Sequence, residues 1–227
     1  MPTIQSARLL YSTSDPVHGF DHVLRVYHLA EYIAICERAD LEIVLAAVLL
    51  HDIDAAQMSE NNRRGKAEAR LQRKQHHHAS SEFAAQILQQ EDWQPARISA
   101  VQHCILSHRF RDGCKQPQTL EARVLYDADK LDAIGAVGVA RALAFALQAG
   151  QPVYTSPSSK FLKSGHLEPG EPHSAYHEYQ FKLRKLKAGI STPTGKQLAE
   201  KRHRLMQDYF ENLAAEMEFT PRPCPQP

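Results

Sequence analysis

An unbroken apolar run of eight residues, from Ile43 to Leu50, is the sequence feature that most limits how this chain can fold. Asp40 precedes the run and is a suitable helix N-cap. A helix that is apolar on every side must be enclosed by other elements. The run ends at His51-Asp52, and such groups are costly to bury unless they are paired or bind a metal. The sequence therefore predicts a buried helix that ends either in a metal-binding pair or in a solvated C-terminal turn.

The composition excludes several classes of protein. The chain has 227 residues, 43% of them hydrophobic and 23% charged, which is typical of one globular domain with or without an appendage. A formal net charge of +1 favours neither a nucleic-acid polymer nor a membrane surface as a partner. The N-terminus lacks the pattern of a signal peptide, no apolar run reaches roughly 18 residues, and the four cysteines form no C-x-x-C pair. We therefore expect a cytoplasmic protein with reduced thiols, no membrane contact and no nucleic-acid polymer as partner.

Helical periodicity recurs along the chain, and no segment has the pattern of a strand. Helices are expected over residues 20–37, 41–52, 80–88, 95–108, 119–149, 174–187 and 195–217. Residues 151–175 are rich in Pro, Gly and Ser and are expected to form a long loop. The predicted fold is all-α, with a helical core over residues 1–150. Residues 151–227 add a loop, C-terminal helices that pack on the core or form a homodimer surface, and a disordered tail after about residue 219.

The polar segment over residues 57–75 has two interpretations. It carries six Lys or Arg residues against only two Glu. Such a segment is typical of a solvated surface loop with some helical tendency. It could instead form a mobile basic lid, extending to about residue 78, that binds phosphate.

Several polar side chains continue the apolar faces of the predicted helices. His22 lies on the face of Val26, Leu29 and Ile33, and His108 follows Ile98, Val101 and Ile105 in the same way. His103 lies about 140° round its helix from His108, so the two cannot easily share one metal. We therefore expect His108 in a cleft and leave His103 open between core and site.

Three aspartates in six residues interrupt the apolar pattern that begins at Thr119. Asp129 shares a face with Leu125 and has Asp132 beside it, whereas Asp127 lies on a different face. Periodicity alone does not choose between these faces. A site made of imidazoles and carboxylates suits Mn²⁺, Fe²⁺, Co²⁺ or Ni²⁺ and tolerates Zn²⁺ or Mg²⁺.

The order His22, His51-Asp52 and Asp129 on successive helices resembles the HD-domain superfamily of metal-dependent phosphohydrolases. The segment His103–His108, the run DADKLDAIG over residues 127–135, and the C-terminal KLRKL and TGK stretches are similar to one bacterial branch of predicted HD phosphohydrolases. The resemblance implies an HD-domain helical bundle with a C-terminal helical extension. It also implies that the metal ligands are His22, His51, Asp52 and Asp129.

The same resemblance implies hydrolysis of a phosphate ester or anhydride, with a nucleotide as the expected substrate of a nucleotidase or a nucleoside triphosphate pyrophosphatase. Asp52, Lys130 and His108 are then the expected catalytic residues. Substrate contacts are expected from Arg25, His76, His103, His108 and Lys130. His76 and His108 are also candidate ligands of a second metal, and Asp54 is either a water-orienting group or a turn residue.

Two features of the sequence depart from the family pattern. Many relatives carry Asp where this chain has Gly19, and Arg109 replaces a more usual Ser. Two other functions also remain open beside hydrolysis. One is a di-iron oxygenase that uses the same ligands, and the other is a nucleotide-binding sensor without catalysis.

Overall fold

The computed structural model describes residues 2–11, 19–53, 66–109 and 116–220, although the side chains of residues 66–76 are not described. Every regular element within these ranges is helical, which confirms the prediction of an all-α chain. The chain divides into two compact units. Unit 1 comprises Met1–Asp132 with Gly189–Leu198, and unit 2 comprises Ala133–Ala188 with Ala199–Pro227.

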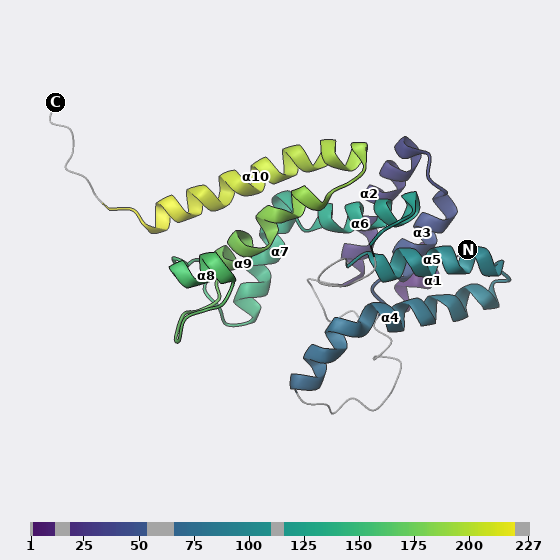
Figure 1. Cartoon of the computed structure of the whole chain (residues 1–227), viewed down its shortest axis with the longest axis horizontal. Coiled ribbons are helices and arrows are strands. Elements are labelled where there is room, and N and C mark those ends of the chain that lie inside the picture. The colour runs from purple at the N-terminus through teal and green to yellow at the C-terminus, as the bar shows by residue number, and fades with distance from the viewer. Residues whose placement is uncertain (1, 12–18, 54–65, 110–115, 221–227) are drawn as a thin grey trace. The chain divides into compact units, whose positions relative to one another are not determined.

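Unit 1 is built around one central helix. It contains α1 (Ile4–Arg8), α2 (Phe20–Glu37), α3 (Leu41–Leu50), α4 (Lys66–Gln90), α5 (Pro95–Ser107) and α6 (Leu120–Asp132). In Figure 1, α3 lies among the other helices of this unit, and it contacts α2, α5 and α6. All residues from Ile43 to Leu50 are buried, as the apolar run predicted. Because α3 is apolar on every side, its position in the middle of the unit is the one in which all of its faces leave water.

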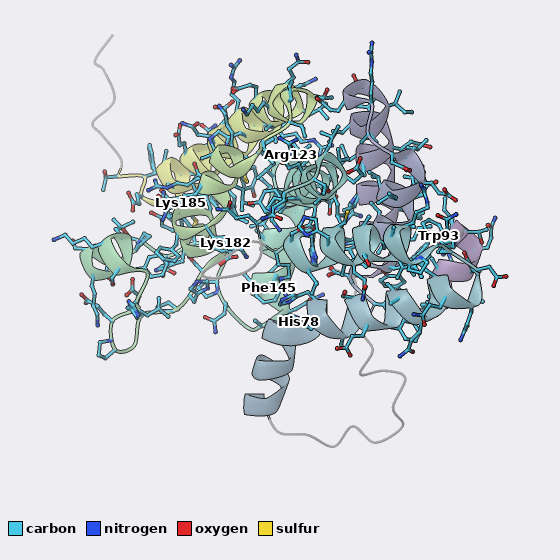
Figure 2. The ribbon with its side chains drawn as sticks, turned by 45° about the vertical axis from the view of Figure 1, so that its right-hand side comes forward. His78, Trp93, Arg123, Phe145, Lys182 and Lys185 are labelled. Carbon is cyan, nitrogen blue, oxygen red and sulfur yellow. The ribbon has the colours of Figure 1, made fainter. Side chains whose placement is uncertain are left out.

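The start of α3 is fixed by polar contacts. Asp40 Oδ1 accepts a hydrogen bond from the Ile43 amide at 3.2 Å, so the predicted N-cap is present. The Arg97 guanidinium on α5 binds Asp40 Oδ2 at 2.9 Å and lies over the ring of Trp93. Figure 2 labels Trp93 at the turn between α4 and α5. These contacts connect α3 to α5 at the end of α3 that lies away from His51.

The expected continuous helix over residues 119–149 is wrong. α6 ends at Asp132 and α7 (Gly135–Gln148) begins after an extended Ile134. Gly135 has φ +78°, a conformation that a side chain disfavours, so the glycine permits the break. A Cβ at Gly138 would also lie 2.3 Å from the carbonyl oxygen of Ala133. The helical pattern did not predict this break.

Two other helix boundaries differ from the expectation. The expected loop over residues 57–75 is helical from Lys66 onward, because α4 extends the predicted helix over residues 80–88 by several turns. Residues 54–65 lie outside the described part of the chain, so the proposed lid over residues 57–78 is described only from Lys66 onward, and its side chains only from His77. The predicted loop over residues 151–175 contains one short helix, α8 (Ser159–Ser164).

Unit 2 has an aromatic core. Besides α7 and α8 it contains α9 (Ala175–Phe181), a 3₁₀ helix (Leu183–Gly189) and most of α10 (Pro193–Met217). Tyr179 on α9 stacks on Phe210 of α10, with ring centroids 4.4 Å apart. Phe161 is fully buried and contacts the rings of His177 and Phe181. These contacts hold the short helices of unit 2 together.

Within the described ranges, no single helix is both long and apolar enough to cross a membrane, and only the bent pair of α6 and α7 together reaches that length and composition.

Candidate metal centre

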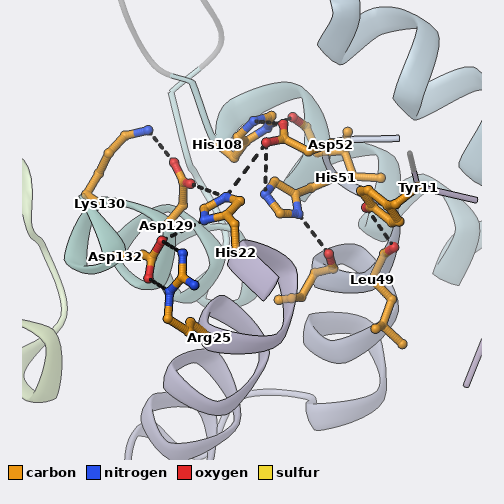
Figure 3. Close-up of polar contacts among 12 residues, drawn as sticks. Tyr11, His22, Arg25, Leu49, His51, Asp52, His108, Asp129, Lys130 and Asp132 are labelled. Atoms are coloured by element: carbon orange, nitrogen blue, oxygen red, sulfur yellow. Dashed lines mark hydrogen bonds and ion pairs between the residues drawn. The ribbon is translucent and has the colours of Figure 1, made fainter. Parts of the chain in front are cut away.

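Five side chains from four helices meet in the interior of unit 1. His22 comes from α2, His51 and Asp52 from the end of α3, His108 from the end of α5, and Asp129 from α6. Figure 3 shows them pointing toward one another, and we call them the His-Asp cluster. The three histidines are buried, whereas Asp52 and Asp129 retain 20% and 16% exposure of their side chains. The cluster is therefore closed by protein on the imidazole side and open to solvent on the carboxylate side.

The ligand atoms of the cluster converge on one small volume. His22 Nε2 lies 3.4 Å from Asp129 Oδ1 and 3.8 Å from Asp52 Oδ2. His51 Nε2 lies 3.6 Å from Asp52 Oδ2. His108 Nε2 lies 3.4 Å from Asp52 Oδ1. Asp52 is thus the carboxylate that all three imidazoles approach.

His51 has its imidazole fixed in one tautomer. Its Nδ1 donates a hydrogen bond to the Val48 carbonyl oxygen at 2.7 Å, so its Nε2 carries the lone pair of the neutral ring. Burial lowers the pKa of His51 to about 4, which keeps the ring neutral at physiological pH. Nε2 is buried and has no hydrogen-bond partner among the described residues. An unpaired buried acceptor aimed at two carboxylates is the arrangement that a bound cation would satisfy.

His108 is oriented in the same way as His51. Its Nδ1 donates to the Ile105 carbonyl oxygen at 2.5 Å, and its Nε2 faces Asp52. The rings of His51 and His108 meet edge to face, with centroids 5.1 Å apart. The sequence analysis expected His108 in a cleft, and in the structure its Nε2 lies beside Asp52 in the His-Asp cluster.

His22 lies between two carboxylates. Its Nε2 faces Asp129, and its Nδ1 lies 2.7 Å from Asp132 Oδ2. Burial lowers the pKa of His22, but hydrogen bonds with Asp129 and Asp132 outweigh burial and raise it to about 9. A metal ion at Nε2 would therefore have to displace a proton.

Lys130 is the cation nearest to the cluster on α6. Its Nζ lies 2.6 Å from Asp129 Oδ2 and 5.1 Å from the centre of the Tyr126 ring. Burial alone would raise the pKa of Asp129, but Lys130, followed by His22, lowers it well below its usual value. Asp129 is therefore ionised and can serve as an oxygen ligand.

Arg25 and Asp132 form an ion pair behind His22. Arg25 Nε donates to Asp132 Oδ1 at 2.7 Å, and its NH2 group donates to Oδ2 at 3.1 Å. Arg25 was expected to contact substrate, whereas in the structure its guanidinium is bound to Asp132. The role of Asp132 was missed, although Arg25 stands three residues after His22 and Asp132 three residues after Asp129. This matched spacing on two helices is a signal that could have revealed the pairing.

Tyr11 is a second polar contact that sequence reasoning missed. Its hydroxyl donates to the Leu49 carbonyl oxygen at 3.0 Å (Figure 3). Burial, with a further contribution from the Asp52 charge, raises the pKa of Tyr11 well above its usual value. The phenol therefore stays protonated and holds the end of α3. Ser80 on α4 donates to the Ile53 carbonyl oxygen at 2.8 Å, so the residues on both sides of Asp52 are anchored.

The other expected site residues lie elsewhere or outside the described part. His103 Nε2 accepts the backbone amide of Gln118 at 3.1 Å, which holds the segment before α6. Asp127 faces away from the cluster and accepts hydrogen bonds from Ser191 and Thr192. The side chain of His76 and the whole of Asp54 are not among the described residues.

The donor set fits a divalent cation. Two overlapping groups, His22 with His51 and Asp129, and His51 with Asp52 and His108, each have ligand atoms within 4.8 Å of one another. Imidazole nitrogen with carboxylate oxygen suits Mn²⁺, Fe²⁺, Co²⁺ and Ni²⁺. Because His51 Nε2 has no hydrogen-bond partner among the described residues, it is the atom of the cluster that best fits a metal ligand.

Comparison with known proteins identifies relatives over nearly the whole chain. The family model described as HD domain matches residues 19–134. YpgQ of Bacillus subtilis (strain 168), an uncharacterised protein, is 33% identical over 199 residues, which cover 86% of this chain and 82% of YpgQ. The crystal structure of YpgQ in complex with ADP has a TM-score of 0.68 and 29% identity, and the match covers 95% of this chain and 98% of that one.

A further solved structure shares the fold. An HD-superfamily hydrolase from Bacillus thuringiensis has a TM-score of 0.66 at 23% identity, with 96% of this chain and 97% of that one covered. This likeness extends over both compact units, and at that identity it bears on the fold alone.

Proposed function

Because this chain belongs to the HD-domain family, we propose that it is a metal-dependent phosphohydrolase that cleaves a phosphate ester or anhydride of a nucleotide. The observation that carries the proposal is the His-Asp cluster, in which the buried His51 Nε2 has no hydrogen-bond partner within the described ranges. The complex of YpgQ with ADP supports the nucleotide as substrate, since YpgQ is similar to this chain over most of its length.

In this proposal the metal is held by His22, His51, Asp52 and Asp129. Two nitrogens and two carboxylate oxygens favour Mn²⁺, Fe²⁺, Co²⁺ or Ni²⁺, and Mg²⁺ or Zn²⁺ are tolerated. When bound, the ion would lower the pKa of a coordinated water and neutralise charge that develops on the phosphoryl group.

Lys130 is proposed to bind a phosphoryl oxygen of the substrate. Its side chain is only 11% exposed, so its charge acts in surroundings of low dielectric. The ammonium shares Asp129 with the proposed metal, and this contact holds Nζ at the edge of the cluster. A cation fixed there in advance stabilises charge that grows during phosphoryl transfer.

His108 is proposed to make a second contact to the phosphoryl group. Its Nδ1 is occupied by the Ile105 carbonyl, so only Nε2 can face the substrate. Once protonated on both nitrogens, His108 would donate its Nε2 hydrogen to a phosphoryl oxygen or to the leaving group. Asp52 Oδ1 lies 3.4 Å from that nitrogen, so the free edge of the His108 ring is directed at the cluster.

The proposal is tested by measuring phosphate and pyrophosphate release from nucleoside mono-, di- and triphosphates and from simple phosphate esters. Each assay is run with Mn²⁺, Co²⁺ and Mg²⁺, and D52A serves as the inactive control. Release that the control lacks supports a metal phosphohydrolase, and the product identifies the phosphorus that is attacked. No release from metal-loaded protein contradicts the proposal, and iron-dependent oxygen uptake or nucleotide binding without turnover would then be measured.

A further inference from the structure

His22 differs from the other two histidines of the cluster in the partner of its second nitrogen. His51 and His108 use backbone carbonyls, at Val48 and Ile105. His22 instead has Asp132, a carboxylate that is 1% exposed, at 2.7 Å from Nδ1. Burying a carboxylate at this position costs free energy unless the carboxylate is hydrogen-bonded and paired with an opposite charge.

The chemistry of this contact fixes which nitrogen of His22 faces the cluster. An ionised carboxylate only accepts hydrogen bonds, so Nδ1 must carry the proton. The lone pair of the neutral ring is then on Nε2, which faces Asp129. A carboxylate behind a ligating imidazole also makes the ring a stronger donor to a metal.

Arg25 holds the Asp132 carboxylate in the orientation in which it accepts the hydrogen bond from His22 Nδ1. Its Nε and NH2 groups reach both carboxylate oxygens, at 2.7 and 3.1 Å. Two parallel hydrogen bonds from a planar guanidinium fix the plane of a carboxylate, which a single ammonium cannot do. The Arg25 side chain is 37% exposed, so the pair connects the buried ring of His22 to the protein surface.

We propose that Asp132 is a positioning residue that orients and polarises His22 as a metal ligand, and that Arg25 holds Asp132 in place. The inference rests on the proposed function, because it assumes that the His-Asp cluster binds a metal. It changes the expected role of Arg25, which acts through Asp132 and does not contact the phosphate.

The first test compares metal affinity in the wild-type protein, D132N and D127N. Asp127 is a matched control because it is a fully buried aspartate on the same helix that faces away from the cluster. Calorimetric titration with Mn²⁺ and Co²⁺ should show about 10- to 100-fold weaker binding for D132N. D127N should bind with wild-type affinity even though its thermal stability falls.

A second readout detects the hydrogen bond itself. The Nδ1 proton of His22 should give a downfield, slowly exchanging NMR signal in both the metal-free and the Zn²⁺-loaded wild-type protein. D132N should lose this signal or shift it upfield, whereas D127N should keep it. Wild-type metal affinity in D132N, or an unchanged signal, would overturn the inference.

R25K tests the inference without removing the carboxylate. Lysine keeps the charge but cannot reach both oxygens in one plane, so metal affinity should fall by less than in D132N. At saturating metal the KM for substrate should match that of wild type. A raised KM at saturating metal with unchanged metal affinity would show that Arg25 contacts the phosphate directly.

Failure of this inference and failure of the proposed function give different results. If the wild-type protein binds metal, D132N binds it less tightly and neither hydrolyses any nucleotide, the function is wrong and the positioning role stands. If the wild-type protein hydrolyses nucleotides and D132N binds metal equally well, the function stands and the positioning role is wrong.

Discussion

Each imidazole of the His-Asp cluster has its tautomer set by the residues around it. In all three, Nδ1 is hydrogen-bonded and Nε2 faces the carboxylates. The rings are also buried, so they lose little further freedom when a metal binds. Orientation of the donors before binding is what distinguishes this cluster from a chance gathering of histidines on a surface.

Asp52 should be the residue whose loss most weakens metal retention. It is approached by His22, His51 and His108, so its removal leaves three imidazoles without their shared anion. We expect D52A to lose its metal on desalting, measured by elemental analysis, and to lose phosphate release with it. D208A, which removes an exposed aspartate on α10, should retain both. Metal content equal to wild type in D52A would remove Asp52 from the ligand set.

Lys130 should contribute more to stabilising the transition state of hydrolysis than to the free energy of unfolding. Its ammonium lies on Asp129 at 2.6 Å, at the edge of the cluster. K130M should lower kcat on the order of 10²-fold, the effect of removing one charge-stabilising donor. K130R should recover part of the rate because it keeps the charge. K182M, which breaks the ion pair with Glu178 in unit 2, is the control and should leave kcat unchanged. If K130M kept the wild-type kcat, Lys130 would have no catalytic role, and its contact with the Tyr126 ring would be structural.

At the scale of elements, α6 carries three aspartates that serve three different partners. Asp129 faces the cluster, Asp132 binds His22 and Arg25, and Asp127 accepts hydrogen bonds from the residues just before α10. Helical spacing places Asp127 about 160° from Asp129 and Asp132 about 60° from it, so the pattern separates one aspartate from the other two. It cannot say which face is the site, because the partners of Asp127 lie more than sixty residues away in the sequence. The family resemblance had to supply that choice.

Asp127 should matter for stability and not for metal binding. Its carboxylate accepts hydrogen bonds from the backbone amides of Ser191 and Thr192 and from the Thr192 hydroxyl. D127N replaces one acceptor oxygen by a donor that faces these groups. We expect it to lower the free energy of unfolding by about 1–3 kcal/mol, measured by denaturant titration. Unchanged stability would show that the 191–195 segment is held by other contacts.

Gly195 offers an independent test of the same junction. A Cβ at this position would lie 2.6 Å from Thr192 Oγ1 and 2.8 Å from Asp127 Oδ2. G195A should therefore destabilise the protein in the same direction as D127N. Both changes act on one set of hydrogen bonds. The double variant should therefore lose less free energy of unfolding than the losses of the two single variants added together.

The break between α6 and α7 marks what local pattern could not predict. Residues 119–149 are apolar at helical spacing throughout, and two glycines in a helix are not by themselves a stop signal. The turn depends on Gly135 adopting a positive φ and on Gly138 leaving room for the Ala133 carbonyl. Helical periodicity reports which side chains share a face, so it does not detect such local backbone conditions.

At the scale of the whole molecule, the candidate site belongs entirely to unit 1. All five cluster residues, together with Arg25, Lys130 and Asp132, lie within Met1–Asp132. The central helix was predictable because eight apolar residues in succession leave no solvent-facing side. The pair His51-Asp52 was predictable as a candidate site because it directly follows this buried run. The contacts of Asp132 and Arg25 with His22 were not predictable, because they depend on how α2 and α6 pack.

Unit 2 contains a row of three hydrogen-bonded side chains, Ser174, His177 and Glu171, that resembles a hydrolase triad but has a structural role. Ser174 Oγ lies 2.7 Å from His177 Nδ1, and His177 Nε2 lies 3.1 Å from Glu171. Ser174 is fully buried and its hydroxyl accepts the His177 amide as the N-cap of α9, so it cannot reach a substrate. Glu171 also accepts hydrogen bonds from the amide and hydroxyl of Ser158 and from the Glu168 amide.

Glu171 should make the stability of unit 2 depend on pH in the acidic range. Hydrogen bonds from the Glu168 amide, Ser158 and His177 lower its pKa to about 2. Because the folded state favours the ionised form, its contribution is present above the usual pKa of a glutamate and is lost as pH falls toward 2. E171Q should therefore be less stable than wild type near neutral pH, and the difference should shrink at low pH. Denaturant unfolding followed by circular dichroism measures this, with E216Q, at an exposed position, as control.

The central claim is that the His-Asp cluster binds the metal on which hydrolysis depends. The most direct test is to remove all metal with a chelator and add Mn²⁺ back stepwise, while bound metal and phosphate release from the preferred nucleotide are measured in the same samples. We predict no release from metal-free protein and a rate that rises in proportion to bound metal until the site is full. Hydrolysis that continues at the full rate without metal, or that does not follow occupancy, would contradict the claim.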